Sequence, residues 1–285
     1  MSVGRGLGKL ILCGEHAVVF GHPALAFAVD RHTTVEVDRC AGASRITADQ
    51  PDGRLVDALA RVVPSEGFAV EIRTDLPVGR GMGSSAALAV ALVRALAALD
   101  GEAVGAEGII DRAMPIEQAF HGNPSGLDVA VAAHGGIVRY RRGPPRQIKH
   151  LAAPRWTVVV LDSGSAGNTA ELVAGVAARR PGVDRALDRI GALVQQAETA
   201  LTDDRALGEI LDENHALLQR IGVSTPPLDA LVGLAKRAGA LGAKLAGAGG
   251  GGVVLALVDE AEPVLRAARK AGVEAWACHP AERQA

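Results

Sequence analysis

The chain has 285 residues, a formal net charge of −2 at pH 7, 48% hydrophobic residues and 2% aromatic residues. This length and hydrophobic content suit one large or two small globular domains with a well-formed core, and they exclude a disordered chain. Because there is no basic surplus and few aromatic rings, nucleic-acid binding is not expected.

Cysteine use and hydropathy point to a reducing compartment without a membrane span. Cys13, Cys40 and Cys278 are odd in number and scattered, so neither a zinc site nor a disulfide framework is predicted. The apolar run near the N-terminus is too short for a signal peptide. The most apolar segment, residues 86–99, is interrupted by Arg94 and is shorter than a membrane span. We therefore expect a cytoplasmic protein that is not bound to a membrane.

The first segment is typical of a strand, a tight turn and a second strand. Lys9 stands at the start of the first strand, and Glu15 and His16 stand side by side in the turn. Burying such a cluster is costly without partners, and the alternative is a surface ion pair beside a solvated histidine. A further strand is predicted over residues 33–37 and a short helix over residues 55–63.

A glycine-rich loop follows a predicted strand that includes residues 69–72. Three glycines alternate with other residues, two serines follow, and a helical run comes next: Gly79, Gly81, Gly83, Ser84, Ser85 and residues 86–99. Glycines with positive φ and the free N–H groups of a helix N-terminus together form an anion site, which most often holds phosphate. The serines could cap the helix in a turn without a ligand, or one could bind Mg²⁺.

A second group of polar residues follows the helix that Gly101 ends. Pro115 predicts that the next helix is kinked or restarted. Glu117 and His121 are four residues apart and share a helix face. A further helix begins near Gly126, with Asp128 in its first turn, where the carboxylate could simply complement the helix dipole.

Prolines between residues 145 and 155 suggest a boundary between domains at 1–150 and 151–285. The second half is predicted to contain strands at 156–161 and 273–277 and helices at 170–179, 184–200, 203–221, 227–239 and 261–271. Residues 244–252 form a second glycine-rich loop between two strands. Because no helix follows these glycines, the loop is not a dinucleotide fingerprint. We interpret it as packing closely against another backbone or a phosphate.

These features suit phosphoryl transfer, which needs a phosphate cradle, a divalent metal, charge neutralisation and a group that orients the attacking hydroxyl. Three segments, residues 8–21, 77–87 and 244–252, resemble in order the three motifs of the GHMP kinases. Within that family the mevalonate kinase branch is the most similar, because of Gly-Glu-His-Ala-Val-Val from Gly14 and His-Gly-Asn-Pro-Ser-Gly-Leu-Asp ending at Asp128.

The resemblance implies an α+β, two-domain GHMP kinase fold. Its N-terminal domain would be ribosomal-protein-S5-domain-2-like, its C-terminal domain ferredoxin-like, and the active site would lie in the cleft between them. The implied reaction is ATP-dependent phosphorylation of the 5-hydroxyl of (R)-mevalonate, giving 5-phosphomevalonate and ADP in isoprenoid biosynthesis. Alternatives are phosphomevalonate or another small alcohol as acceptor, or a catalytically inactive nucleotide-binding sensor. A homodimer remains open.

The resemblance also implies roles for individual residues. Asp128 would accept or orient the proton of the acceptor hydroxyl, and Lys9 would neutralise charge beside it. Ser85 and Glu117 would hold Mg²⁺. The ATP phosphates would be bound by the first glycine-rich loop: Pro77, Gly79, Gly81, Met82, Gly83, Ser84, Ser85, Ala86 and Ala87.

The acceptor would be bound by Lys9 and Asp128 together with Glu15, His16 and Thr169. A lysine close to an aspartate favours the ionised carboxylate. A cation is also needed for the carboxylate of the acceptor, and Arg80, His16 and Lys9 are unranked candidates.

Overall fold

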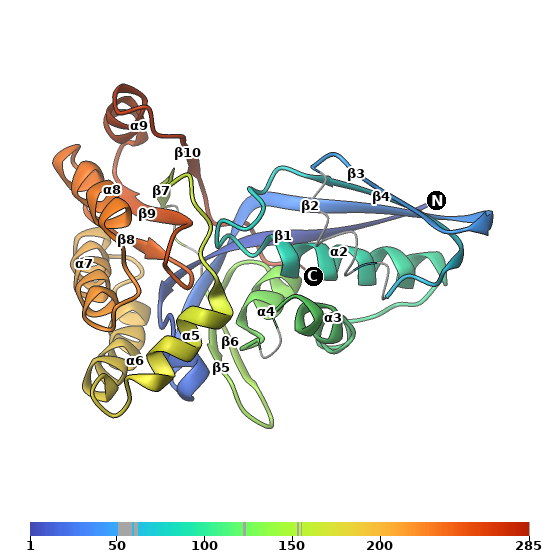
Figure 1. Cartoon of the computed structure of the whole chain (residues 1–285), viewed down its shortest axis with the longest axis horizontal. Helices are drawn as coiled ribbons and strands as arrows, with labels where there is room; N and C mark the ends of the chain where they lie inside the picture. Colours follow the sequence, from blue (N-terminus) through green and yellow to red (C-terminus); the bar gives the residue numbers. More distant parts are fainter. Residues whose placement is uncertain (51–58, 60–61, 122–123, 153, 155, 285) are drawn as a thin grey trace.

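The computed structural model describes residues 1–285 except 51–58, 60–61, 122–123, 153, 155 and 285. Figure 1 shows two parts that lie side by side, each with one sheet. The helix expected over residues 55–63 falls mostly outside the described residues. Among the helices that are described, none is long and apolar enough to cross a membrane.

The N-terminal part is built on a six-stranded sheet in which β2 pairs with three other strands. The strands are β1 (Ser2–Cys13), β2 (Pro23–Ala43), β3 (Arg45–Ala48), β4 (Glu66–Thr74), β5 (Ile137–Arg141) and β6 (Gln147–Leu151). The turn between β1 and β2 contains a short 3-10 helix, η1 (Ala17–Phe20). The run predicted at 33–37 is the middle of β2, a single strand of 21 residues. Strands β3, β5 and β6 were not predicted, because each is short and carries polar residues.

Three helices cover one face of this sheet (Figure 1): α2 (Ser84–Leu99), α3 (Ala106–His121) and α4 (Leu127–His134). Two glycines of β1 allow α2 to come close. A Cβ at Gly4 or Gly6 would lie 2.0 Å from a main-chain oxygen of that helix. Helix α3 runs without a break through Pro115, so of the predicted kink or restart, the restart does not occur.

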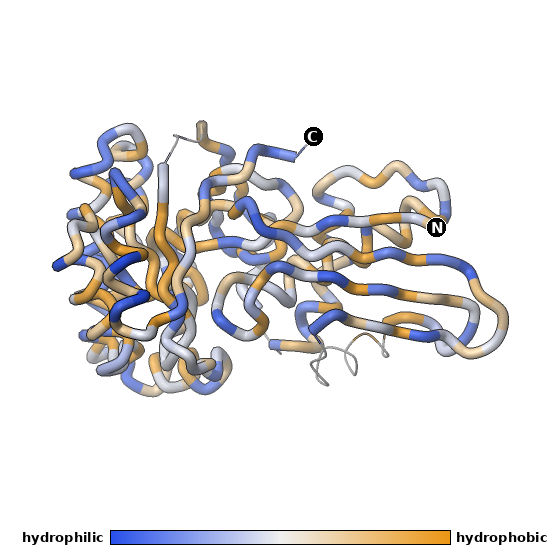
Figure 2. The backbone as a smooth tube through the Cα atoms, turned by 90° about the horizontal axis from the view of Figure 1, so that it is seen from above, coloured by the Kyte–Doolittle hydropathy of each residue, from blue (hydrophilic) through white to orange (hydrophobic). Residues whose placement is uncertain are grey.

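The C-terminal part has a four-stranded antiparallel sheet in the order β10-β7-β9-β8. Its strands are β7 (Thr157–Asp162), β8 (Gly242–Ala246), β9 (Val253–Val258) and β10 (Ala275–Cys278). Its helices are α5 (Thr169–Ala178), α6 (Asp184–Thr199), α7 (Asp204–Arg220), α8 (Pro226–Arg237) and α9 (Ala261–Lys270). Every residue of β8 and β9 is buried, and Figure 2 shows hydrophobic backbone between the outer helices of this part and the N-terminal part.

An apolar cluster joins the two parts. It includes Leu10 and Phe27 from the first sheet together with Leu193 and Leu255 from the second part. The chain also returns to the N-terminal part after β10, where the amide of Ala281 donates to a carbonyl of β2. The last strand of the first sheet, β6, ends at Leu151, one residue beyond the predicted domain boundary, and β7 of the second sheet begins at Thr157. The boundary itself stays a prediction. The two-domain α+β fold is confirmed.

Candidate active site

The first glycine-rich loop leads from β4 into α2. Gly79, Gly81 and Gly83 have φ values of +73°, +84° and +74°, a region that favours glycine. Gly83 is the N-cap of α2 and no side chain caps this helix, so the capping role considered for the serines is not observed. The helix therefore begins at Ser84, two residues before the predicted start. The first N–H groups of α2 have no side-chain acceptor among the described residues, so they are available to bind an anion.

Lys9 reaches this loop from β1. Its side chain is 3% exposed, its Nζ lies 3.1 Å from Oδ2 of Asp128, and it donates to the carbonyl of Gly81 at 3.0 Å. Gly83 lies directly over the lysine stem, because a Cβ there would be 2.9 Å from Lys9 Cγ. The aspartate is in the first turn of α4, as predicted, and its side chain is 32% exposed. One carboxylate, one ammonium group and the glycine-rich loop therefore meet at one point.

Glu117 and Ser85 form a second pair beside the first. Ser85 Oγ donates to Oε1 of Glu117 at 3.2 Å, and Nε2 of His121 lies 3.0 Å from the same hydroxyl. Burial is the main reason that the pKa of Glu117 rises to about 8, and the charge of Asp128 raises it further, whereas Ser85 and Lys9 oppose this. Its Oε2 is buried without a partner among the described residues. Among the described residues its nearest ion-pair partner is His121, whose Nε2 lies 3.6 Å from Oε1 and whose pKa is lowered mainly by burial, so this partner is a neutral imidazole.

A divalent metal fits this position. Magnesium prefers hard oxygen ligands and usually keeps water and phosphate oxygens in its shell. Within the described ranges, no three His, Cys, Asp or Glu side chains converge as a metal cage. Ser85 and Glu117 would therefore hold Mg²⁺ only together with oxygens from outside the protein, as expected for a metal that accompanies a nucleotide.

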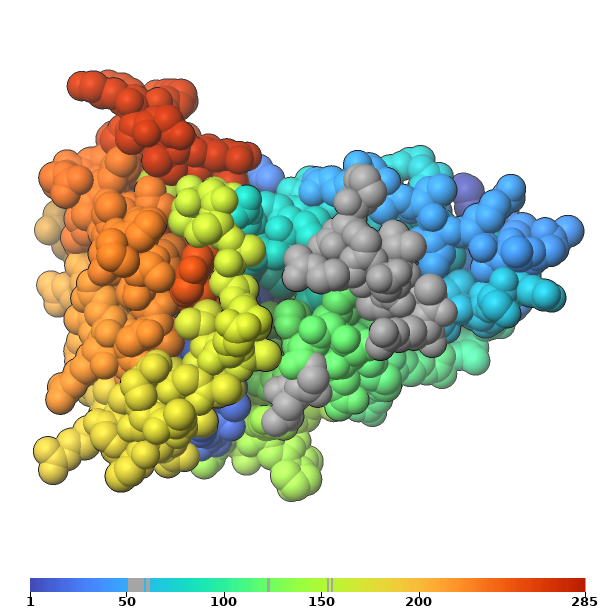
Figure 3. Space-filling model, in the orientation of Figure 1, coloured from blue at the N-terminus to red at the C-terminus, as the bar shows by residue number. Residues whose placement is uncertain are grey.

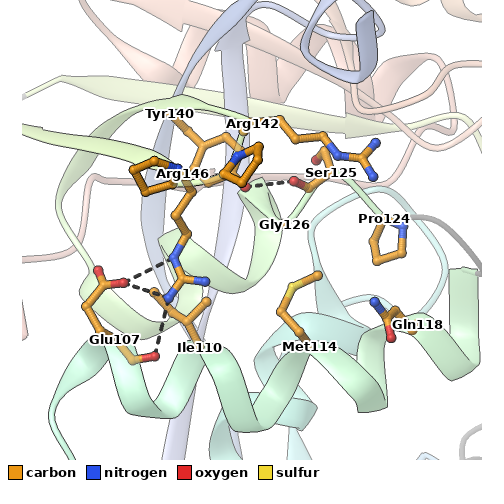
Figure 4. A pocket seen from close by; sticks show the side chains of 13 residues that line it. Glu107, Ile110, Met114, Gln118, Pro124, Ser125, Gly126, Tyr140, Arg142 and Arg146 are labelled. Atoms are coloured by element: carbon orange, nitrogen blue, oxygen red, sulfur yellow. Dashed lines mark hydrogen bonds and ion pairs between the residues drawn. The ribbon is translucent and has the colours of Figure 1, made fainter. Parts of the chain in front are cut away.

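The start of α4 is fixed by Tyr140 on β5. The tyrosine hydroxyl donates to the carbonyl of Ser125 at 2.7 Å, as Figure 4 shows. A Cβ at Gly126 would lie 2.6 Å from that hydroxyl, and Gly126 has a φ of +87°. These contacts line a cavity of about 480 Å³ behind the segment that leads to Asp128. Tyr140 thus supports the loop that positions the aspartate.

The turn at Glu15 is joined to the C-terminal part by a buried ion pair. Glu15 is 1% exposed, and its carboxylate accepts from Nζ of Lys244 and, at 3.0 Å, from Nδ2 of Asn214. Lys244 is fully buried on β8 and also donates to the carbonyl of Ile11 at 3.1 Å. Both oxygens of Glu15 therefore have protein partners, and neither is open to a ligand.

His16 continues the same turn with a φ of +59°. Its Nε2 lies 2.7 Å from the carbonyl of Ala248, which can only accept, so Nε2 carries the proton. Burial lowers the pKa of His16, although the Ala248 carbonyl and Glu15 oppose this. The imidazole is therefore neutral, and its buried Nδ1 is an acceptor without a partner in the described part of the chain.

The second glycine-rich loop packs against the backbone of the first. Cβ atoms at Gly247 and Gly252 would lie 3.4 Å from Gly81 and 2.8 Å from the carbonyl of Arg80. The sequence left open whether this loop packs against another backbone or a phosphate, and the contact observed is with backbone. The side chain of Arg80 is paired as well, with its Nε 3.3 Å from Asp162.

The structure thus brings together four of the predicted site residues: Lys9, Ser85, Glu117 and Asp128. Thr169 is the first residue of α5 and is exposed on the C-terminal part. The predicted residue set lacked Asn214, Tyr140 and Lys244. Only Lys244 gave a signal in the sequence, as a rare lysine beside a glycine-rich loop.

Comparison with known proteins gives consistent matches over the whole chain. The GHMP kinases N terminal domain is matched by residues 53–136 and the GHMP kinases C terminal domain by residues 192–274. A mevalonate kinase of Pyrococcus abyssi is 36% identical, with 87% of this chain and 86% of the relative covered. A mevalonate kinase of Thermococcus onnurineus is 35% identical, with 88% and 87% covered. The crystal structure of L. major mevalonate kinase in complex with R-mevalonate has a TM-score of 0.87 at 28% identity, covering 99% of this chain and 97% of that one.

Proposed function

The chain belongs to the GHMP kinase family, and from this premise we propose that it is a mevalonate kinase. It transfers the γ-phosphoryl group of ATP to the 5-hydroxyl of (R)-mevalonate and forms 5-phosphomevalonate and ADP, a step of isoprenoid biosynthesis. The contact between Lys9 and Asp128 beside the first glycine-rich loop carries this proposal. The acceptor is supported by the mevalonate kinase relatives and by the L. major complex.

The ATP phosphates are assigned to residues 77–87. The left-handed glycines turn main-chain amides inward, and the uncapped first turn of α2 adds donors and a partial positive charge. Lys9 lies beneath this loop with its ammonium group at the carbonyl of Gly81. Lys9 thus places one positive charge next to the phosphoryl group and next to Asp128, where negative charge develops during transfer.

Asp128 is assigned to the acceptor hydroxyl. Phosphoryl transfer passes through a loose transition state, so the hydroxyl needs orientation more than early removal of its proton. The carboxylate accepts a hydrogen bond from the 5-hydroxyl, aligns its oxygen with the γ-phosphorus, and takes the proton as the new bond forms. The salt bridge with Lys9 and the N-terminal position on α4 both hold the carboxylate in place.

Ser85 and Glu117 are assigned to Mg²⁺. The fit rests on Oε2 of Glu117, which is buried without a partner among the described atoms, and on the serine hydroxyl that contacts the same carboxylate. The ion would supply charge neutralisation on the phosphate oxygens. His121 contacts Ser85 and holds the hydroxyl toward Glu117.

His16 and Thr169 are assigned to the acceptor. The neutral imidazole offers a buried acceptor at Nδ1, which suits the 3-hydroxyl of mevalonate, a group that is not phosphorylated. Glu15 is assigned instead to holding this turn, because Lys244 and Asn214 occupy its carboxylate.

A panel of acceptors tests the proposal. We expect ADP release that depends on mevalonate, and much slower release with phosphomevalonate, homoserine or galactose at equal concentration. Identification of the product by phosphorus NMR separates transfer from ATP hydrolysis. ADP release with phosphomevalonate but not with mevalonate would reassign the acceptor, and release with none of the four would favour the inactive sensor.

A further inference from the structure

A cavity of about 390 Å³ lies beside α5, and none of its lining residues belongs to the residues assigned above to the metal and the phosphates. It is bounded by the segment before this helix, by one side of the helix and by the second glycine-rich loop at Gly250. Figure 3 shows α5 and the segment before it at the surface, where the N-terminal and C-terminal parts meet. Its charged lining residues are Glu171 and Arg179.

The guanidinium group of Arg179 folds back along α5 into a space left by two glycines. A Cβ at Gly175 would lie 3.4 Å from its Nη1, and a Cβ at Gly222 would lie 3.5 Å from its Cζ. Nη2 donates to the carbonyl of Ile221 at 2.7 Å, which fixes the plane of the group. Among the described residues, the other N–H groups of the fork have no hydrogen-bond acceptor and are left for another one.

Within the described part of the chain Arg179 lacks a carboxylate partner, in contrast to the next residue. Arg180 pairs with Asp184 at 2.6 Å and lies over the ring of Phe20. No ion pair or carboxylate hydrogen bond involves Arg179 within the residues that the structure describes. Glu171, the acid that lines the same cavity, accepts a hydrogen bond from the side chain of Asn168 instead. A guanidinium group at a cavity without a carboxylate paired to it is a binding group for a carboxylate or phosphate.

The cations suggested by the sequence for the carboxylate of the acceptor are otherwise engaged. Lys9 is paired with Asp128 and Arg80 with Asp162. His16 is neutral, and its free Nδ1 carries a lone pair that repels a carboxylate. None of the three offers an uncompensated positive charge.

Arg179 lies within electrostatic reach of the Glu15–His16 turn. Burial is the largest cause of the lowered pKa of His16, and the positive charge of Arg179 contributes in the same direction. The second glycine-rich loop links the two places directly. It binds His16 through the carbonyl of Ala248 and borders the cavity two residues later at Gly250.

We propose that Arg179 binds the carboxylate of the acceptor and that the cavity beside α5 is the subsite for this end of the substrate. The inference rests on the proposed function, because it takes the acceptor to be a hydroxy acid. The acceptor is then held at two ends, with its reacting hydroxyl at Asp128 and its carboxylate at the guanidinium fork. Two of the glycines that line the subsite, Gly175 and Gly222, leave the space that the guanidinium group occupies.

The test compares Arg179→Gln with Arg180→Gln, a neighbouring arginine whose charge is already compensated. For Arg179→Gln we expect the KM for mevalonate to rise roughly 10- to 100-fold, as for loss of a charged hydrogen-bonded pair, with little change in the KM for ATP. Arg180→Gln keeps the wild-type KM for mevalonate. Arg179→Lys falls between, because it retains the charge but loses the two-pronged geometry.

A second acceptor makes the test independent of folding defects. In 3-methylpentane-1,3,5-triol the carboxylate of mevalonate is replaced by a hydroxymethyl group. The wild-type enzyme should prefer mevalonate to this triol, and Arg179→Gln should lose that preference while using the triol as well as the wild type does. An Arg179→Gln enzyme that keeps its preference for mevalonate would overturn the inference and leave the proposed function intact. Absence of mevalonate-dependent ADP release in the wild type would overturn both.

Discussion

Replacing Lys244 by methionine tests the buried connection between the two parts of the molecule. The ammonium group is fully buried, and it donates to the Glu15 carboxylate and to the carbonyl of Ile11. Methionine has a similar length but removes both hydrogen bonds and the charge. The carboxylate of Glu15 would then be buried with Asn214 as its remaining partner.

The expected loss of stability is large. Removing one member of a buried ion pair strands the other charge and costs about 3–5 kcal/mol. In chains of roughly 150–250 residues each kcal/mol shifts Tm by about 2–4 °C, which corresponds here to a decrease of roughly 6–20 °C. Urea unfolding followed by circular dichroism at pH 7 measures the free energy directly, provided that refolding is complete.

The double variant Glu15→Gln with Lys244→Met is the matched control. It removes the stranded charge, and an uncharged pair in place of a buried ion pair is often close to neutral in stability. We therefore expect the double variant to be more stable than Lys244→Met alone. The reasoning is refuted if Lys244→Met loses less than about 1 kcal/mol, or if the second substitution only adds to the loss.

Three further predictions concern the site itself. Glu117→Gln should weaken binding of Mn²⁺ in the presence of ATP by at least tenfold, measured by electron paramagnetic resonance, and an unchanged affinity would remove Glu117 from the metal shell. In the wild type, metal affinity should fall as pH is lowered below about 8, because the carboxyl group of Glu117, with its raised pKa, keeps a proton that the metal must displace. A metal affinity that stays constant between pH 6 and 8 would contradict this. Gly83→Ala should lower kcat at least tenfold, because the added Cβ would displace the side chain of Lys9. The control Gly101→Ala should keep the wild-type kcat, because Gly101 also has a positive φ but a Cβ there would meet no atom within 4 Å. Equal kcat values for the two variants would argue against the close approach of Gly83 to Lys9.

Local patterns predicted most of the elements, whereas the roles of Lys9 and Asp128 were implied by the resemblance to the GHMP kinases and stay predictions. The glycine-rich loop before α2 is visible because its glycines alternate and a long apolar helix follows. The pattern also placed Asp128 in the first turn of a helix that begins near Gly126, where the carboxylate could equally complement the helix dipole. Both signals lie within a few residues of the feature that they predict. The same locality explains the failures, since β2 is one long strand only because three neighbours pair along it.

Partners distant in the sequence could not be predicted. Glu15 and Lys244 are separated by 229 residues, and Asn214 lies inside a helix whose pattern shows only a core face. The sequence therefore could not show that Glu15 is compensated. Arg179 was missed for the converse reason, because an arginine at the end of a helix normally complements the dipole. Only the tertiary structure shows that it lies at a cavity and that, among the described residues, no carboxylate pairs with it.

The role of Asp128 is tested most directly by Asp128→Asn. Asparagine keeps the shape of the side chain but removes the charge that pairs with Lys9 and accepts the proton of the hydroxyl. Single-turnover phosphorylation of mevalonate, with ATP binding measured by calorimetry on the same preparation, separates chemistry from binding. We predict that the rate falls by roughly 10²- to 10⁴-fold while ATP affinity stays within a few-fold of wild type. A near-normal rate would contradict the assignment of Asp128 and, with it, the proposed arrangement of the site.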